Sequence, residues 1–206
     1  MNNNFSNNVV FQKYDINRII RETKNGYKSK VIWFTGISGS GKSTISNILE
    51  KILFKHNINT YVLDGDNVRS GLCSDLTFSS CDRNENIRRI SEVSKLMLDA
   101  GIMVLVSVIS PYKQQRLIAS KIIGKDNFIE VFIDTPINIC EDRDPKGLYK
   151  KSRSNEICNF TGINSVYEAP EKPDIYLDGT ISLEENVKNL IQQLYINNII
   201  FFSTYS

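Results

Sequence analysis

Residues 36–43 read GISGSGKS, and this glycine-rich segment restricts the possible folds strongly. An apolar, β-branched run at 30–35 precedes the segment and is typical of a strand buried on both faces. Residues 43–55 follow it, and their apolar side chains recur at helical spacing. Glycines let the backbone turn so that successive N–H groups and the positive helix end face one bound anion. The pattern G-x-x-x-x-G-K-S in this context predicts a triphosphate-binding loop and argues against a chance match.

In such a loop, Lys42 reaches the β- and γ-phosphates of the nucleotide and the Ser43 hydroxyl binds Mg²⁺. The residues expected to contact ATP are Gly36, Ile37, Ser38, Gly39, Ser40, Gly41, Lys42, Ser43 and Thr44. No N-K-x-D segment, which guanine-selective switch proteins need, occurs in the chain. The sequence therefore favours an enzyme over a signalling switch.

Strand and helix patterns alternate along the chain. We expect strands at 30–35, 60–63, 103–109, 128–133 and 174–177, and helices at 43–55, 82–101, 111–124, 136–140 and 182–197, with Asp82 as the cap of the second helix. This alternation predicts an α/β, P-loop NTPase-type three-layer fold. Its mostly parallel sheet carries helices on both faces and collects ligands at the carboxyl ends of the strands.

The interval 144–172 interrupts this alternation, because it is rich in Lys, Arg, Asn, Gly and Pro and has little apolar periodicity. A loop of that length in a compact domain is usually functional, so we expect a lid. The 206 residues otherwise suit one domain at 29–198, with an N-terminal arm at 1–28 and a tail at 199–206. The apolar start of that tail is interpreted as core or interface rather than as a free sticky end.

Composition excludes several classes of protein. The 25 Lys+Arg and 23 Asp+Glu residues leave a net charge of +2, too balanced for a protein that coats nucleic acid or a membrane surface. No zinc-ligand spacing can be built from the cysteines and the one histidine, which are Cys73, Cys81, Cys140, Cys158 and His56. The first ten residues are polar and Asn-rich, so we expect no secretory signal, a cytoplasmic protein and free thiols.

Two carboxylates follow the expected strand at 60–63. Asp64 and Asp66 lie at its carboxyl end, and therefore on the same edge of the sheet as the phosphate loop. They could hold Mg²⁺ or accept the proton of an attacking hydroxyl. A solvated acidic turn explains the same two residues equally well from the turn alone.

Longer blocks of sequence carry a family resemblance. Residues 64–72 (DGDNVRSGL), 75–79, 82–90, 109–112, 143–151, 159–163 and 167–170 closely resemble adenylyl-sulfate kinases, in particular the stand-alone bacterial type. The match runs from about residue 30 to residue 194, and several separated blocks in the right order are far more specific than a phosphate loop alone.

The resemblance implies transfer of the ATP γ-phosphoryl group to the 3′-hydroxyl of adenosine 5′-phosphosulfate (APS), giving 3′-phosphoadenosine 5′-phosphosulfate. It implies ATP and Mg²⁺ as cofactors and a homodimer. The matching positions assign catalysis to Lys42, Asp64 and Ser110, metal binding to Ser43 and Asp64, and a further ATP contact to Arg143. They assign the acceptor to Asp66, Arg69, Phe78, Arg83, Asn86, Ile109, Ser110, Lys146, Phe160 and Thr161.

Some assignments stay open on the sequence. The division of roles between Asp64 and Asp66 is one. Another is Ser110, which matches a serine described in the family as a phosphoserine intermediate, although direct in-line transfer needs no protein nucleophile and no histidine lies next to it. Phe78 and Phe160 match a pair that sandwiches the acceptor adenine, with a plain core role as the alternative.

The sequence departs from the family pattern at Thr77, Lys113, Asn164 and Val166, and none of these changes removes a proposed chemical group. The alternatives to an adenylyl-sulfate kinase are a P-loop kinase for another small-molecule acceptor and a nucleotide-binding interaction protein without catalysis.

Overall fold

The computed structural model describes residues 10, 12–157 and 159–201. Its strands are β1 (Val31–Thr35), β2 (Thr60–Asp64), β3 (Met103–Ser107), β4 (Phe128–Asp134) and β5 (Ile175–Asp178). Its helices are α1 (Arg18–Asn25), α2 (Lys42–Lys55), α3 (Gly65–Ser70), α4 (Ser80–Asp99), α5 (Lys113–Ile123), the 3-10 helix η1 (Lys125–Asn127), α6 (Ile137–Arg143), α7 (Leu148–Arg153) and α8 (Leu183–Ile196).

The five strands form one parallel sheet in the order β2-β3-β1-β4-β5. Strand β1 lies at its centre, paired with β3 on one side and β4 on the other. All five residues of β1 are buried, as the apolar run predicted. The carboxyl end of the central strand therefore delivers the phosphate loop to the middle of the sheet edge.

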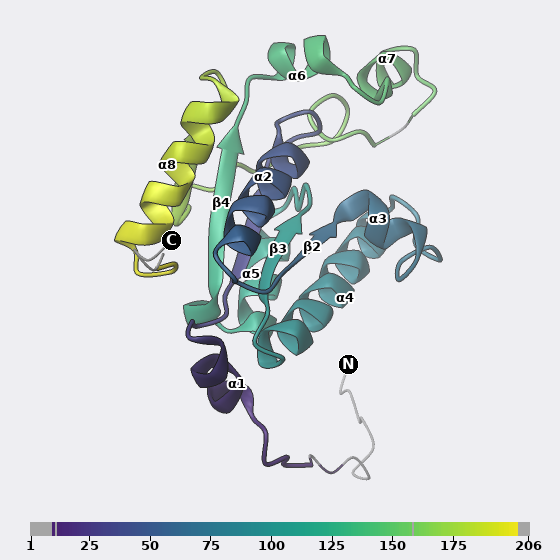
Figure 1. Ribbon diagram of the computed structural model, residues 1–206. Helices are drawn as coiled ribbons and strands as arrows, with labels where there is room; N and C mark the ends of the chain where they lie inside the picture. The colour runs from purple at the N-terminus through teal and green to yellow at the C-terminus, as the bar shows by residue number, and fades with distance from the viewer. Residues whose placement is uncertain (1–9, 11, 158, 202–206) are drawn as a thin grey trace.

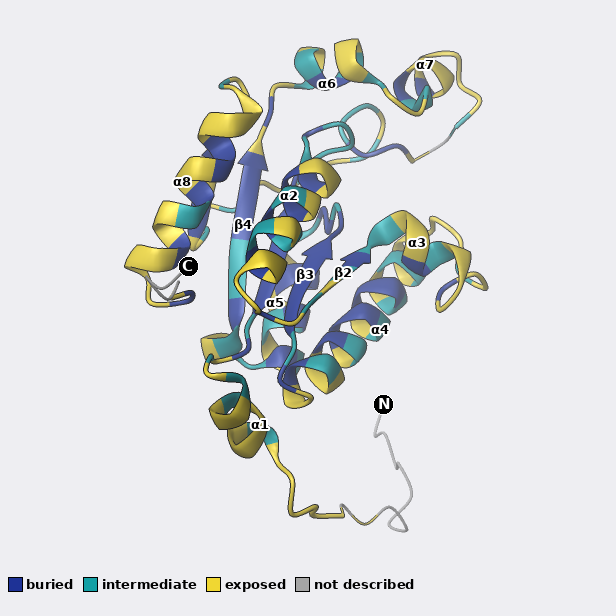
Figure 2. Cartoon of the chain, viewed as in Figure 1, coloured by how far each residue is buried: buried dark blue, intermediate teal, exposed yellow. Residues whose placement is uncertain are grey.

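Two buried clusters cover the two faces of the sheet (Figure 2). Alternate β1 side chains point to opposite faces: Ile32 and Phe34 pack with residues of α2 and α8, whereas Val31 and Trp33 pack with residues of α4 and α5. This arrangement confirms the predicted α/β fold with helices on both faces. Helices α6 and α7 lie beyond the arrowhead of β4, at the end of the sheet opposite α1 (Figure 1).

Several local predictions need correction. The expected polar turn after β2 is helix α3, capped by Asp64 Oδ1, which accepts from Asp66 N at 3.0 Å. Asp82 does not cap α4: Ser79 does so, accepting from Asp82 N at 3.1 Å, while the Asp82 carboxylate accepts from Thr77 N at 3.0 Å. A carboxylate committed to the preceding loop cannot also cap the helix.

The remaining differences are helices in segments without a predicted element and shifted ends of predicted elements. The arm contains α1, the lid contains α7, the strand expected to reach residue 109 ends at Ser107, and the helix expected from Pro111 begins at Lys113. In the tail, Ile199 and Ile200 are buried in the α2–α8 cluster, as the core interpretation predicted, whereas Phe201 is 62% exposed and Phe202 lies outside the described residues.

Cys73, Cys81 and Cys140 are free thiols, as expected, and Cys158 lies outside the described residues. Within the described part of the chain, no helix has the length and apolarity needed to cross a membrane.

Candidate active site

A cavity of about 1050 Å³ opens where the strands end. The phosphate loop, the ends of β2 and β3, the start of α4 and the lid segment all contribute to its wall. Of the predicted site residues, those that line it are Ser38, Gly39, Ser40, Gly41, Lys42, Ser43, Thr44, Asp64, Asp66, Arg69, Phe78, Arg83, Asn86, Ile109, Ser110, Arg143, Lys146, Phe160 and Thr161. Gly36 and Ile37 are not in the lining; their carbonyl groups instead accept hydrogen bonds from Lys42.

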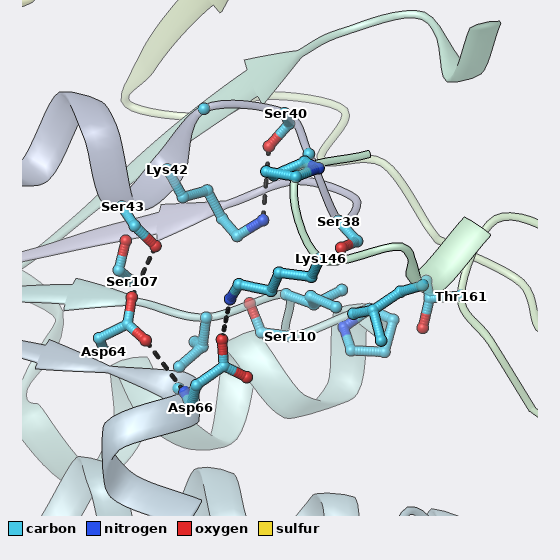
Figure 3. A pocket seen from close by; sticks show the side chains of 18 of the residues that line it. Ser38, Ser40, Lys42, Ser43, Asp64, Asp66, Ser107, Ser110, Lys146 and Thr161 are labelled. Atoms are coloured by element: carbon cyan, nitrogen blue, oxygen red, sulfur yellow. Dashed lines mark hydrogen bonds and ion pairs between the residues drawn. The ribbon is translucent and has the colours of Figure 1, made fainter. Parts of the chain in front are cut away.

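The phosphate loop holds a buried lysine. Lys42 Nζ donates to the carbonyls of Gly36 at 2.9 Å and Ile37 at 2.7 Å, and burial lowers the pKa of Lys42 to about 8. Nζ also donates to Ser40 Oγ at 3.4 Å (Figure 3). A Cβ on Gly36, whose φ is 151°, would lie 2.7 Å from the carbonyl oxygen of Ile133, so a side chain has no room there. The loop thus presents a desolvated cation and the start of α2, an arrangement suited to a polyanion.

The two carboxylates after β2 face different parts of the cavity. Asp64 Oδ2 accepts from Ser43 Oγ at 2.6 Å, which places Asp64 against the phosphate loop. Asp66 forms an ion pair with Lys146 of the lid (Figure 3). The two carboxylates therefore have different partners, although Asp64 Oδ1 also accepts a hydrogen bond from Asp66 N.

In another part of the cavity wall, two arginines surround an exposed ring. The Arg69 guanidinium lies 4.4 Å from the centroid of Phe78, and that of Arg83 lies 5.7 Å from it. Phe78 is 59% exposed. Arg83 also reaches the lid, donating to the Asn159 carbonyl at 2.7 Å and to Thr161 Oγ1 at 3.2 Å. This cluster offers an aromatic face and guanidinium groups to an anionic ligand.

The loop that carries Phe78 is fixed by a position where the sequence departs from the family pattern. Thr77 donates from both its backbone N and its hydroxyl to the Asp82 carboxylate, and its carbonyl accepts from Arg69 at 3.1 Å. Phe160, the other predicted stacking residue, packs edge-on against Tyr149, with ring centroids 4.9 Å apart. Phe160 is therefore part of a small buried cluster between the lid and α6 as well as of the cavity wall.

Ser110 lies deep in the wall and is 2% exposed. Its hydroxyl accepts from Trp33 Nε1 at 3.1 Å and donates to Thr35 Oγ1 at 3.1 Å. Both hydrogen-bonding roles of this hydroxyl are thus taken by the protein interior. Asn86, which lines the cavity, is 6% exposed, and within the described part of the chain its Oδ1 atom has no hydrogen-bond partner.

Some residues of the cavity wall were not anticipated from the sequence. Beyond Arg143, which donates to the Gly179 carbonyl at 3.2 Å, the cavity is closed by Ile181, Leu183 and Asn186. Asn186 Nδ2 donates to the Asp178 carbonyl at 2.7 Å, and its buried Oδ1 has no partner among the described residues. In the sequence, Asn186 is one more polar residue on an amphipathic helix, so no local signal marks it.

Tyr149 was also missed as a contact of the phosphate loop. Its hydroxyl donates to the Ser38 carbonyl at 2.7 Å, which ties α7 to that loop. Its position within a family block, next to the basic residues of the lid, was the available signal.

The central strand of the parallel sheet leads into a phosphate loop, and the same cavity has a second anion-binding wall and a basic lid. These features together define a P-loop kinase. A solved sugar kinase from Janibacter shares the fold, with a TM-score of 0.59 at 18% identity.

The comparisons with known proteins are more specific. The family model for adenylylsulphate kinase matches residues 28–178. The adenylyl-sulfate kinase of Buchnera aphidicola subsp. Acyrthosiphon pisum is 64% identical over 202 residues, covering 98% of each chain, and that of Citrobacter koseri is 57% identical over 187 residues, covering 91% of each. The chain belongs to the adenylyl-sulfate kinase family.

A solved structure of the family aligns closely with this chain. The Mycobacterium tuberculosis APS kinase, in complex with AMPPNP and APS, is 48% identical with a TM-score of 0.79, and the match covers 82% of this chain and 99% of that one. A hexameric APS kinase from Thiobacillus denitrificans has a TM-score of 0.66 at 27% identity, covering 89% of this chain and 31% of the other.

Proposed function

We propose that this chain is a cytoplasmic adenylyl-sulfate kinase. It transfers the γ-phosphoryl group of ATP to the 3′-hydroxyl of APS, and ADP and 3′-phosphoadenosine 5′-phosphosulfate are the products. The observation that carries the proposal is one cavity that is lined both by the phosphate loop with Lys42 and by the arginine–aromatic cluster around Phe78. The complex of the Mycobacterium tuberculosis relative with AMPPNP and APS supports it.

On the donor side, the phosphate loop binds the triphosphate. Backbone N–H groups at the start of α2 and the Lys42 ammonium neutralise phosphate charge, and the incoming anion favours the protonated form of Lys42. Arg143 and the Gly179–Asn186 end of the cavity are assigned to the adenosine part of ATP. Phosphoryl transfer depends mainly on positioning and charge neutralisation, which these groups supply.

The residues near the donor fit a magnesium ion. Ser43 Oγ and Asp64 Oδ2 lie 2.6 Å apart and are both oxygen ligands, the type that Mg²⁺ prefers. No group of three or more His, Cys, Asp or Glu side chains suited to a metal occurs in the described residues, which agrees with an ion held by few protein ligands together with substrate phosphates. When bound, Mg²⁺ supplies charge neutralisation at the β- and γ-phosphate oxygens.

On the acceptor side, Arg69, Arg83 and Asn86 bind the phosphosulfate group and Phe78 stacks on the adenine. Asp66, with Lys146, is assigned to the ribose. Asp64 is assigned to the metal and to the proton of the attacking hydroxyl. The lid at 144–172 covers both substrates and excludes water from the transfer.

For Ser110 we propose a role without covalent catalysis. The hydroxyl is committed to Trp33 and Thr35, so transfer proceeds directly from ATP to the acceptor. Ser110→Ala is expected to retain turnover within about tenfold of wild type, since one buried hydroxyl contributes about 1 kcal/mol. Loss of turnover in this variant, together with a competent phosphoserine trapped in a single turnover of the wild type, would contradict this assignment.

The test of the function is an ADP-release assay with purified chain, ATP and Mg²⁺. Release is expected with APS and absent with AMP or adenosine as acceptor, and it should stop when Mg²⁺ is removed. Turnover with a different acceptor would favour another small-molecule kinase, and ATP binding without turnover would favour a non-catalytic nucleotide-binding protein. We also propose a homodimer, which light scattering of the purified protein would test.

A further inference from the structure

Arg116 of α5 is a buried arginine whose guanidinium is divided among three separate segments. It is 4% exposed. Its Nε lies 2.8 Å from Glu130 Oε1 on β4, one terminal nitrogen donates to the Ser110 carbonyl at 2.8 Å, and the other donates to the Glu168 carbonyl at 2.7 Å. Each nitrogen therefore has a partner on a different part of the chain.

The contact at Glu168 is made where the lid returns to the sheet. The Glu168 backbone N donates to the Pro111 carbonyl at 2.8 Å, and its carboxylate accepts from Lys113 N at 2.7 Å. The preceding residue, Tyr167, stacks on Phe132 with ring centroids 6.0 Å apart. This end of the lid is thus attached directly to residues 111–113. They follow residues 108–110, which leave the end of β3, line the cavity and are called the acceptor-side loop below.

The same network holds Ser110 in a strained conformation. Ser110 has a φ of 39°, a left-handed value that non-glycine residues rarely adopt and that costs about 1–3 kcal/mol unless the surroundings enforce it. Arg116 fixes its carbonyl, while Trp33 and Thr35 fix its hydroxyl. Its neighbours Ile109 and Pro111 line the cavity, so the backbone angle at Ser110 sets the shape of this part of the wall.

Thr35 extends the network to the phosphate loop. Its hydroxyl donates to the Ile109 carbonyl at 2.7 Å, accepts from Ser110, and lies 2.9 Å from the Tyr167 hydroxyl. Because the Thr35 proton is committed to Ile109, Tyr167 is the donor in that last contact. Burial raises the pKa of Tyr167 to about 12, so its hydroxyl keeps this proton at neutral pH. Thr35 immediately precedes Gly36, the first residue of the phosphate loop.

We propose that Arg116 is a positioning residue for the transfer reaction, which holds the acceptor-side loop at Ser110 and the returning end of the lid at Glu168 in fixed relation to the phosphate loop. The inference rests on the proposed function. A planar guanidinium is needed because its nitrogens point in different directions, whereas a lysine offers all its protons from one nitrogen. The alternative is that Arg116 only neutralises the buried Glu130 carboxylate.

The experiment compares Arg116→Lys with two controls. Arg116→Lys keeps a positive charge for Glu130, but its single nitrogen cannot also reach the carbonyls of Ser110 and Glu168. Glu130→Gln removes the ion pair and leaves those two carbonyl contacts in place. Arg18→Lys alters a partly buried arginine of α1, a helix at the end of the sheet opposite α6 and α7 (Figure 1); Arg18 likewise bonds a carboxylate, Glu22, at 2.7 Å and a backbone carbonyl, that of Ser29, at 2.7 Å.

For Arg116→Lys we expect kcat/KM for APS to fall about tenfold or more, with KM for ATP changed less than about twofold, because small displacements of bound reactants are costly in rate. Both controls should keep the APS parameters of the wild type, even where their melting temperatures fall. All assays are run at a temperature where each variant is folded by circular dichroism.

A second variant keeps the proposal testable if Arg116→Lys does not fold. Tyr167→Phe removes the hydroxyl that bonds Thr35 and retains the ring, and it is expected to lower kcat/KM for APS about threefold or more with the ATP KM unchanged. Wild-type APS kinetics in the folded variants, or equal losses in Glu130→Gln and Arg116→Lys, would overturn the inference while leaving the proposed function intact. A wild-type chain without APS-dependent turnover would instead refute the proposed function, and the inference with it.

Discussion

Truncation of Phe78 separates ligand binding from folding stability. Because 59% of Phe78 is exposed, removal of its ring in Phe78→Ala should cost about 1 kcal/mol or less in the free energy of unfolding. Stacking of an aromatic side chain on a base contributes about 1–3 kcal/mol to binding. The dissociation constant for APS is therefore expected to rise roughly 5- to 150-fold, since 1.4 kcal/mol corresponds to about a factor of ten.

The measurement is isothermal titration of APS into the protein saturated with AMPPNP, alongside urea unfolding of each variant. Phe54→Ala is the matched control, because Phe54 is 72% exposed near the end of α2 and does not line the cavity. It should change stability by a similar amount and leave APS binding unaltered. An APS dissociation constant within twofold of wild type in Phe78→Ala would refute the assignment of this ring to the acceptor base.

Three further predictions concern the rest of the cavity. In steady-state assays, Asp64→Asn should lower kcat about 100-fold or more, whereas Asp66→Asn should mainly raise KM for APS. Unchanged turnover in both variants would remove these carboxylates from the mechanism. Burial lowers the pKa of Lys42 to about 8, and a bound triphosphate favours the protonated form of this side chain. Calorimetry should therefore show that the affinity for AMPPNP falls as the pH rises above about 8. Lys42→Met should abolish this pH dependence. In Gly179→Ala the new Cβ would lie 1.8 Å from Thr135 Oγ1. The free energy of unfolding, measured in urea, should therefore fall by about 1–3 kcal/mol, and KM for ATP should rise. Gly71→Ala is the control, because its Cβ would meet nothing within 4 Å and should change neither quantity.

The sequence was most informative where structure depends on local chemistry. The phosphate loop requires glycines at fixed spacing between a buried strand and a helix, so β1, the loop and α2 could be predicted together. The α/β class followed from the alternation of patterns. The positions of Asp64 and Asp66 on the same edge as that loop followed from parallel strand direction alone.

Elements that depend on distant contacts could not be predicted. Helix α1 has eight residues, which is short for a clear helical period, and none of them is buried; Arg18 secures it through Ser29. Helix α7 has six residues, too few for a helical period, and is held by Tyr149 against Ser38. Helix α3 was mistaken for a turn for the same reason of length.

Side chains of the site that depend on distant contacts could not be predicted either. The three partners of Arg116 lie 6, 14 and 52 positions away in the chain, so no local pattern reveals that its guanidinium is shared. Asn186 turns inward because its amide bonds the Asp178 carbonyl, a contact that the polar pattern of α8 does not indicate. Family resemblance found the residues that match a motif, and the structure was needed for those that hold them in place.

The central claim is that two anionic nucleotides bind face to face in one cavity, with the 3′-oxygen of APS directed at the γ-phosphorus of ATP. A crystal structure of this chain with AMPPNP and APS tests it most directly. The account predicts the triphosphate on the loop at Lys42, the APS adenine on Phe78, and the 3′-oxygen about 3–3.5 Å from the γ-phosphorus. APS bound away from Phe78 and the two arginines, or with its 3′-oxygen turned from the triphosphate, would contradict the account.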